Sequence, residues 1–368
     1  MLNRQNFSNK LTKWFQTERA HLPVPGRGDS NPYAIWVAEV MLQQTQVTTV
    51  WPYYENWMEK YASISSLAAA DQDQVLKSWE GLGYYSRARN LHAGAKYVLD
   101  VFNGKLPGSV PELLTIPGVG PYTAAAIASL AFGIPEPLMD GNVLRVYSRL
   151  TRLKEDIGQS KTKAAISSEL GRLISPGQPA DFNQGLMDLG RVICTPRNPN
   201  CESCPLKNIC LSAGTEDLES FPVKEKRKPL PHYHIVIGLI QKGECLLIQK
   251  RPANGLLGGL WEFPGGKNEV GESDEKALLR EISEETSLEV GLGEKIGTIN
   301  HAYTHFKITM SAWFCDWIEG EALTQASSEN KWIPFTEINR YAFPKANLKI
   351  LALISRLDTS TLEKSVLE

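Results

Sequence analysis

The segment CTPRNPNCESCPLKNIC (194–210) holds four cysteines within 17 residues, and the rest of the chain is best interpreted outward from it. Cys194, Cys201, Cys204 and Cys210 are spaced C-x6-C-x2-C-x5-C. Four thiolates in one short loop can wrap either a tetrahedral zinc ion or a [4Fe–4S] cluster. Zinc sites more often pair two short hooks, whereas only one hook is short here, and four unrelated thiols rarely occur at this density.

Length and composition bound the class of protein. A chain of 368 residues with 42% hydrophobic and 22% charged residues is typical of a soluble globular protein with two domains. Net charge is −2, divided into +3 for residues 1–230 and −5 for the remainder, which permits a DNA-binding first half without establishing one. The N-terminal segment lacks the apolar stretch of a signal peptide and no run reaches transmembrane length. We therefore expect a cytoplasmic protein with no membrane contact and no structural disulfides.

Helix signals dominate up to residue 211 and strand signals dominate after residue 231. Helices should start at Asn31-Pro32, at Ser109 and at Pro121, the last one ending at Gly133. Residues 212–231 are acidic, then basic, and end in two prolines, which is typical of a linker. The sequence therefore predicts a multi-domain protein with an all-α domain (1–211), a linker (212–231) and an α+β domain (232–368).

Within the second domain, residues 235–240 and 245–248 around Lys242-Gly243 predict a hairpin. Alternating apolar residues at 306–314 predict a long strand, and helices are expected at 274–286 and 346–357. Cys245 and Cys315 fall in the apolar strands, so we expect them to be inert core thiols.

The segment LTIPGVGPYTA (114–124) joins two predicted helices through Gly118 and Gly120. Glycines there let the backbone approach a phosphate, and the amides of the next helix point at it. Together with the cysteine spacing, this segment resembles the helix-hairpin-helix motif of the endonuclease III superfamily of DNA glycosylases. The resemblance implies a [4Fe–4S] cluster on the four cysteines. Bifunctional relatives carry a Schiff-base lysine where this chain has Tyr122, which implies a monofunctional enzyme that uses water.

Two acidic residues stand in further motifs. IWVAEVMLQQT (35–45) places Glu39 among mainly apolar helix positions, and MDGNVLR (139–145) places Asp140 at a turn before a helix. Taken alone, Glu39 would be interpreted as part of a solvated helix face and Asp140 as a helix N-cap. Together with GLGYYSRARNL (81–91), these segments resemble the MutY-type adenine DNA glycosylases over nearly the whole chain.

Breaking an N-glycosidic bond requires protonation of the leaving purine and stabilisation of an oxocarbenium-like sugar, which calls for two acids. The resemblance implies that Glu39 protonates adenine N7 and then activates water, so apolar neighbours should raise its pKa. Asp140 is expected to stay ionised beside the cationic sugar, stabilising it electrostatically or through a covalent bond. Further positions match DNA- or base-contacting residues of the family, with core packing as the alternative for Tyr84: Gln44, Tyr84, Tyr122, Asn142 and Gln184.

This chain departs from the family pattern ahead of the catalytic helix. The family usually has Leu-Pro-Trp-Arg there, whereas residues 22–27 of this chain are LPVPGR. An aromatic and a cation expected near the base pocket are therefore missing or moved.

The second domain carries two motifs of its own. HAYTH (301–305) resembles the loop that reads 8-oxoguanine in this family, through Tyr303, Thr304 and His305, although a plain hairpin turn with a packed tyrosine is the alternative. A nearly complete Nudix box runs from Gly266 to Ser287, which replaces its final glycine. Its helix carries Glu281, Glu284 and Glu285, which suit a Mg²⁺ ion, although a solvated acidic helix without function is the favoured alternative. WEFPGG (261–266) and FPKAN (343–347) resemble MutT, the hydrolase of 8-oxo-dGTP.

Three hypotheses follow. The first is a monomeric enzyme that excises adenine opposite 8-oxoguanine or guanine from duplex DNA. The second is a Nudix nucleoside-triphosphate hydrolase, alone or as a second activity. The third is a lesion-binding protein without catalysis, suggested by the altered segment 24–25. The joint presence of Glu39 and Asp140 argues against the last two as complete accounts.

Overall fold

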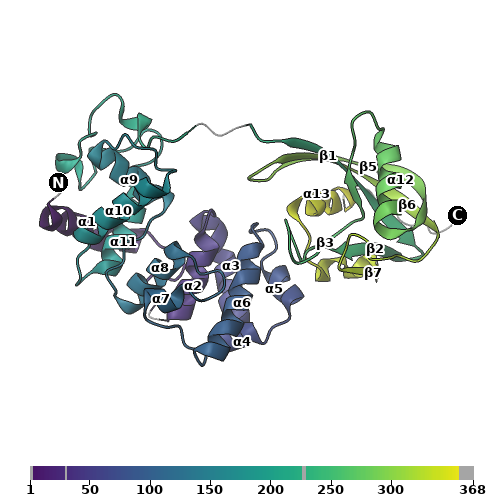
Figure 1. Cartoon of the computed structure of the whole chain (residues 1–368), viewed down its shortest axis with the longest axis horizontal. Coiled ribbons are helices and arrows are strands. Elements are labelled where there is room, and N and C mark those ends of the chain that lie inside the picture. Colours follow the sequence, from purple (N-terminus) through teal and green to yellow (C-terminus); the bar gives the residue numbers. More distant parts are fainter. Residues whose placement is uncertain (1–2, 30, 226–228, 356–368) are drawn as a thin grey trace. The chain divides into compact units, whose positions relative to one another are not determined.

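The computed structural model describes residues 3–29, 31–225 and 229–355. Their contacts divide the chain into two compact units, Met1–Ala69 with Asn90–Arg227 and Ala70–Arg89 with Lys228–Glu368 (Figure 1). The sequence places all of residues 1–211 in one domain, whereas the structure groups residues 70–89 with the C-terminal unit. The expected boundaries at residues 211 and 232 stay a prediction. Within the described ranges, no helix is long and apolar enough to cross a membrane.

The first unit is built from helices, with three 3₁₀ turns (Arg19–His21, Lys207–Ile209 and Leu218–Ser220) and a π-helical turn (Leu189–Ile193) among the described residues. The helix starts expected at Asn31, Ser109 and Pro121 are all confirmed, and Gly133 ends α8 in the left-handed conformation. Its helices are α1 (Arg4–Glu18), α2 (Pro32–Leu42), α3 (Val47–Lys60), α4 (Ile64–Ala68), α6 (Ser86–Val101, which begins in the second unit), α7 (Val110–Leu113), α8 (Pro121–Phe132), α9 (Gly141–Thr151), α10 (Ser160–Leu173) and α11 (Pro179–Asp188).

The loop that contains the four cysteines is fixed to a hydrophobic core formed by α1, α9, α10 and α11. Three of the cysteines pack against that core, which includes Phe7 and Phe182. Arg149 of α9 is fully buried and donates hydrogen bonds to the carbonyl oxygens of Thr195 (2.6 Å) and Pro196 (2.8 Å). Its Nε also donates to the carbonyl oxygen of Phe221 at 3.1 Å. The first part of the expected linker 212–231 is thus packed onto this unit. Lys226, Arg227 and Lys228 of that linker lie outside the described residues.

The glycine-containing segment 114–124, predicted to join two helices, forms the turn between α7 and α8. Gly118 has φ +79°, and a Cβ there would lie 2.4 Å from the Cβ of Asn90 on α6. The turn therefore requires glycine both for its backbone conformation and for its close approach to α6. Gly120 is the N-cap of α8, followed by Pro121 at the first helical position.

The C-terminal unit is a mixed sheet between helices, with α5 (Gln72–Ser78) in its N-terminal segment. Strand order is β3-β2-β1-β6-β5, with β4 paired to β1 and β7 paired to β2, and β1 and β6 run parallel. The predicted hairpin of β1 and β2 and the predicted long strand are confirmed. The elements are β1 (His232–Lys242), β2 (Cys245–Lys250), β3 (Trp261–Glu262), β4 (Gly265–Lys267), α12 (Asp274–Thr286), β5 (Glu289–Ala302), β6 (Lys307–Glu319), β7 (Glu329–Pro334), a 3₁₀ turn (Phe335–Arg340) and α13 (Lys345–Ile354).

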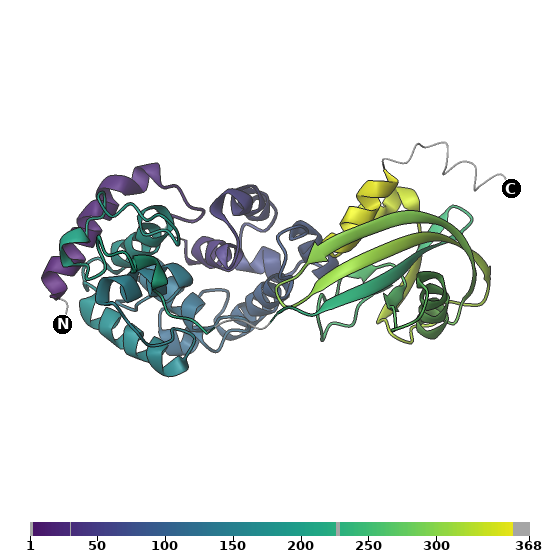
Figure 2. The same ribbon diagram turned by 90° about the horizontal axis from the view of Figure 1, so that it is seen from above.

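The alternation of side chains along β1 and β6 explains why helices cover both faces of the sheet (Figure 2). Ile237 and Met310 pack with α13 on one face, whereas Val236 and Cys315 pack with α12 on the other. The helix expected at 274–286 is confirmed. The last helix ends earlier than expected among the described residues, and Leu357 lies outside them.

We predict that Gly118→Ala destabilises the helical unit more than Gly133→Ala does. Both glycines have positive φ, at +79° and +67°, and alanine in that region costs about 1–2 kcal/mol. A Cβ at Gly133 meets nothing within 4 Å, so the additional loss at Gly118 measures the collision with Asn90. Thermal unfolding followed by circular dichroism checks this, and equal decreases in Tm would contradict it.

Candidate active site

Glu39 is buried in α2, where its neighbours on all sides are apolar. Every residue from Tyr33 to Met41 is buried, and Glu39 itself is 7% exposed. The hydroxyl of Tyr122, on α8, donates a hydrogen bond to Glu39 Oε2 at 2.8 Å. Burial raises the pKa of Glu39 to about 7, against the opposing effect of the Tyr122 hydrogen bond. The expectation that apolar neighbours raise the pKa of Glu39 is thus met.

Asp140 is the N-cap of α9. Its carboxylate accepts hydrogen bonds from the backbone N–H of Val143 at 2.7 Å and from Asn142 Nδ2 at 2.9 Å. Burial raises the pKa of Asp140, while these hydrogen bonds and the charge of Arg145 favour the anion. The helix N-terminus favours it as well. That Asp140 stays ionised remains a prediction.

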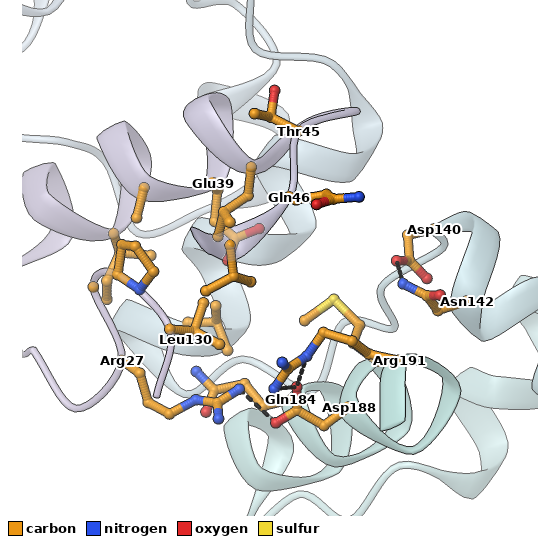
Figure 3. Close-up of a pocket in the computed structure, with 18 of the residues that line it drawn as sticks. Arg27, Glu39, Thr45, Gln46, Leu130, Asp140, Asn142, Gln184, Asp188 and Arg191 are labelled. Carbon is orange, nitrogen blue, oxygen red and sulfur yellow. Dashed lines mark hydrogen bonds and ion pairs between the residues drawn. The ribbon is translucent and has the colours of Figure 1, made fainter. Parts of the chain in front are cut away.

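Both acids line one cavity of about 500 Å³, together with Tyr122, Asn142 and Gln184 (Figure 3). The structure therefore brings together five of the residues that were predicted separately. A second cavity, of about 750 Å³, shares three of them (Tyr122, Asp140 and Asn142) and adds Gln44, Gly118 and Gly120. Gln44 is exposed and has φ +57°, a strained backbone for a residue other than glycine.

The altered segment 22–27 also reaches the catalytic cavity. Arg27 lines it and pairs with Asp188 at 2.7 Å, so the expected cation is present, at position 27. The aromatic is not replaced within the described part of the chain, where Tyr122 is the one aromatic residue that lines this cavity. Sequence reasoning missed Asp188 and Arg191, whose side chains join Arg27 there. No local signal marks them, since Asp188 ends α11 and Arg191 follows it, far along the chain from Arg27.

Arg145 is a further residue that sequence reasoning missed. Its Nη2 donates to Asn142 Oδ1 at 2.9 Å, and its Nε donates to the carbonyl oxygen of Cys194 at 2.8 Å. Because Asn142 in turn donates to Asp140, a continuous chain of hydrogen bonds links the cysteine loop to the second acid. The sequence signal that could have identified Arg145 is its position three residues after Asn142 on the same helix, where the two side chains can meet.

The four cysteines converge without forming a site for one ion. Burial raises the pKa of Cys204 to about 11, and the other three thiols add to that shift, so all four lie near one another. Among the described residues, no three His, Cys, Asp or Glu side chains are placed to hold a single metal ion. Thiolates around one zinc would each lie about 2.3 Å from it. The convergence of Cys194, Cys201, Cys204 and Cys210 on one loop suits an iron–sulfur cluster, whose irons are held by four thiolates.

The C-terminal unit joins Tyr84 to the 301–305 loop. Tyr84 is 38% exposed with φ +49°, and its hydroxyl forms a hydrogen bond with Thr304 Oγ1. Tyr303 stacks on Phe306 with ring centroids 4.7 Å apart, and its N–H donates to the Phe306 carbonyl oxygen at 2.8 Å. Thr304 and His305 are exposed at the tip of this turn. Two of the expected lesion-contacting positions, Tyr84 and Thr304, are therefore in direct contact.

The Nudix-box carboxylates are held by protein groups. Arg280 lies 2.9 Å from both Glu272 and Glu281 and 3.2 Å from Glu284. Glu285 accepts hydrogen bonds from Gln249 Nε2 at 2.6 Å and from the N–H of Gly265 at 3.1 Å. The prediction of Mg²⁺ at Glu281, Glu284 and Glu285 stays untested.

Three protein-family profiles match this chain. The HhH-GPD superfamily base excision DNA repair protein profile matches residues 37–172, and the iron-sulfur binding domain of endonuclease III matches residues 194–210. A NUDIX domain profile matches residues 235–353. The predicted fold class and the iron–sulfur loop are thereby confirmed.

Curated relatives and solved structures agree with these matches. The adenine DNA glycosylases of Rattus norvegicus and Homo sapiens are 34% and 33% identical to this chain, over 94% of it and 77% and 73% of their own lengths. That of Buchnera aphidicola subsp. Schizaphis graminum is 28% identical over 94% of this chain and 98% of its own. A thermostable thymine-DNA glycosylase is similar in structure, with TM-score 0.51 and 30% identity over 57% of this chain and 96% of its own. Endonuclease III trapped covalently on DNA has TM-score 0.50 and 27% identity, over 58% of this chain and 98% of its own.

We predict that Tyr122→Phe raises the pKa of Glu39 above about 7, because it removes the hydrogen bond that favours the ionised carboxylate. The protonated form should then persist to higher pH. Carbon-13 NMR titration of glutamate-labelled protein checks this, with the Glu39→Gln variant assigning the resonance. A decrease in this pKa, or no change, would show that the hydrogen bond does not act on the carboxylate.

Proposed function

Since this chain belongs to the adenine DNA glycosylase family, we propose that it hydrolyses the N-glycosidic bond of adenine mispaired with 8-oxoguanine or guanine in duplex DNA. The observation that carries this proposal is one cavity lined by two acids in different environments. Glu39 is held by apolar burial and a neutral hydroxyl donor, whereas Asp140 sits at a helix N-terminus among three groups that favour the anion. Burial raises the pKa of both carboxyl groups, and the three groups around Asp140 oppose that rise, which is how one site can supply both an acid and an anion at neutral pH.

Each group has a role that follows from its surroundings. Protonated Glu39 donates its proton to N7 of the extruded adenine, which leaves as a neutral base, and the resulting carboxylate can accept a proton from water. Asp140 stabilises the positive charge that develops on the sugar, and Asn142 and Arg145 fix its orientation. Among the residues that the structure describes, no lysine lines either cavity, so no described amine is placed to form an imine, which supports hydrolysis by water.

The other predicted site residues are proposed to contact DNA rather than to take part in breaking the N-glycosidic bond. Gly118 and Gly120 present the amides of α8 to a phosphate, and Gln44 lies beside them at the second cavity. Tyr84, Tyr303, Thr304 and His305 form an exposed polar and aromatic tip on the C-terminal unit that suits contact with the base opposite adenine. The iron–sulfur group would be held by Cys194, Cys201, Cys204 and Cys210 and would secure the loop beside α9, with no step of hydrolysis passing through it.

The alternative hypotheses have less support. A lesion-binding protein without catalysis would not require two acids, one of them buried, on one cavity. For a triphosphate hydrolase, the carboxylates of α12 would need to be released from Arg280 and Gln249 before they could bind Mg²⁺. We therefore propose lesion recognition, rather than nucleotide hydrolysis, for the C-terminal unit.

We predict that Glu39→Gln and Asp140→Asn each slow adenine excision by about 10²–10⁴-fold, because an essential acid or anion is lost at nearly constant shape. Duplex binding should change little, since Gly118, Gly120 and the C-terminal unit remain. The measurement is single-turnover excision from a duplex with adenine opposite 8-oxoguanine, detected as strand cleavage after alkali. Excision by Glu39→Gln at the wild-type rate would overturn the proposed function.

The double variant Tyr303→Ala, Thr304→Ala should reduce the preference for 8-oxoguanine over guanine opposite adenine. It removes the stacked ring and the hydroxyl that contacts Tyr84. The ratio of excision rates on the two duplexes measures this preference, with Thr324→Ala, a threonine outside the 301–305 loop, as the control. An unchanged ratio would show that the lesion is read elsewhere.

A further inference from the structure

Arg149, near the end of α9, carries a buried positive charge that no carboxylate of the described residues balances. Its side chain is among the largest that are fully buried, at 1% exposure. Within the described part of the chain, its N–H groups donate to one sulfur atom and to the carbonyl oxygens of Cys194, Thr195, Pro196 and Phe221. Carbonyl oxygens satisfy these donors but do not neutralise the charge. Since arginine is almost never fully buried unless it is paired, a partner other than Asp or Glu is required.

The sulfur atom beside this charge belongs to the first cysteine of the loop. Arg149 Nη1 lies 3.4 Å from Cys194 Sγ. The backbone carbonyl oxygen of Arg149 lies 3.7 Å from Cys210 Sγ, so the last cysteine of the loop contacts the same turn of α9. Both cysteines also pack against the hydrophobic core of this unit, which limits screening of the charge by water. The guanidinium is therefore placed to act on the sulfur atoms.

An iron–sulfur cluster on these cysteines supplies the missing negative charge. Four thiolates carry more negative charge than the iron–sulfur core carries positive charge, so the assembled group is an anion. A guanidinium group that donates to a thiolate forms a charge-assisted hydrogen bond, the stronger kind. Arg145 of the same helix differs in this respect, because its Nε reaches the carbonyl oxygen of Cys194 rather than the sulfur.

We propose that Arg149 is the counter-charge of the iron–sulfur cluster and raises its reduction potential. The inference rests on the match of residues 194–210 to an iron-sulfur binding domain and does not depend on the proposed hydrolysis of adenine. A nearby positive charge stabilises the form of the cluster that holds one more electron, because that form is the more negative one. Net charge and hydrogen bonds to the sulfur atoms are the means by which a protein sets this potential.

The test separates the charge of Arg149 from its hydrogen bonds. Arg149→Gln removes the charge and keeps an amide donor, whereas Arg149→Lys keeps the charge and loses the planar set of donors. Arg152→Gln is the control, because it removes one positive charge at the end of the same helix, where the side chain is 33% exposed and pairs with Asp217. Iron per chain is measured first. The reduction potential of each iron-loaded protein is then measured by voltammetry on a graphite electrode.

We expect Arg149→Gln to lower the reduction potential. At a fixed applied potential, the ratio of oxidised to reduced cluster should rise by about 10-fold, equal to about 59 mV for one electron. Arg149→Lys and Arg152→Gln should each change this ratio by less than about 3-fold, since the first keeps the charge and the second removes an exposed one. Loss of iron from Arg149→Gln but not from Arg149→Lys would also support the inference, because the charge would then be needed to assemble the thiolates.

Three results would overturn the inference. The first is an Arg149→Gln protein that keeps both its iron and the wild-type potential. The second is a decrease in potential as large in Arg149→Lys as in Arg149→Gln, and the third is loss of iron from both. Either of the last two would show that Arg149 acts through the hydrogen bonds that hold the loop rather than through its charge.

Discussion

Burial of the Glu39 carboxyl group inside an apolar helix is the constraint on which the helical unit depends. A polar group taken out of water without a hydrogen bond costs roughly 2–7 kcal/mol, so Glu39 requires a donor from a neighbouring element. Tyr122 on α8 supplies it, and α2 must therefore pack against α8. Because α8 begins at the Gly118–Gly120 turn, the same contact fixes the hairpin that is proposed to hold DNA beside the acid. Catalytic and DNA-binding geometry thus share one helix.

A second set of buried polar contacts ties the cysteine loop to the site. Carbonyl oxygens at the start of the loop that backbone N–H groups leave unpaired can accept hydrogen bonds from side-chain donors. Arg149 and Arg145 of α9 are such donors, at the carbonyl oxygens of Cys194, Thr195 and Pro196. Arg145 also reaches Asn142 and, through it, Asp140. These hydrogen bonds therefore link the cysteine loop to Asp140 through α9.

The sequence predicts most of what depends on local chemistry. Helix starts at Asn31 and Ser109 follow from side chains that cap their own helices, and the alternation on β6 follows from a sheet covered on both faces. Glu39 and Asp140 were found through motifs. Asp188 and Arg191 were not, because their roles arise from contacts with Arg27 more than 160 residues away. The grouping of residues 70–89 with the C-terminal unit is long-range in the same way. The local sequence around Asp188, Arg191 and residues 70–89 contains no pattern that predicts these long-range contacts.

A raised carboxyl pKa does not by itself identify the catalytic acid in this protein. Burial raises the pKa of Glu262 to about 7, the same value as for Glu39. Glu262, however, is bound by Arg251 Nη1 through both carboxylate oxygens, at 2.8 and 2.6 Å, and lies on neither cavity described above. A substrate could take the proton of Glu262 only by displacing this bidentate arginine from it. Glu39 is held by a neutral hydroxyl and faces open volume, so its proton is available to a bound base. Access and the charge of the partner, rather than the pKa alone, assign the hydrolytic chemistry to the helical unit.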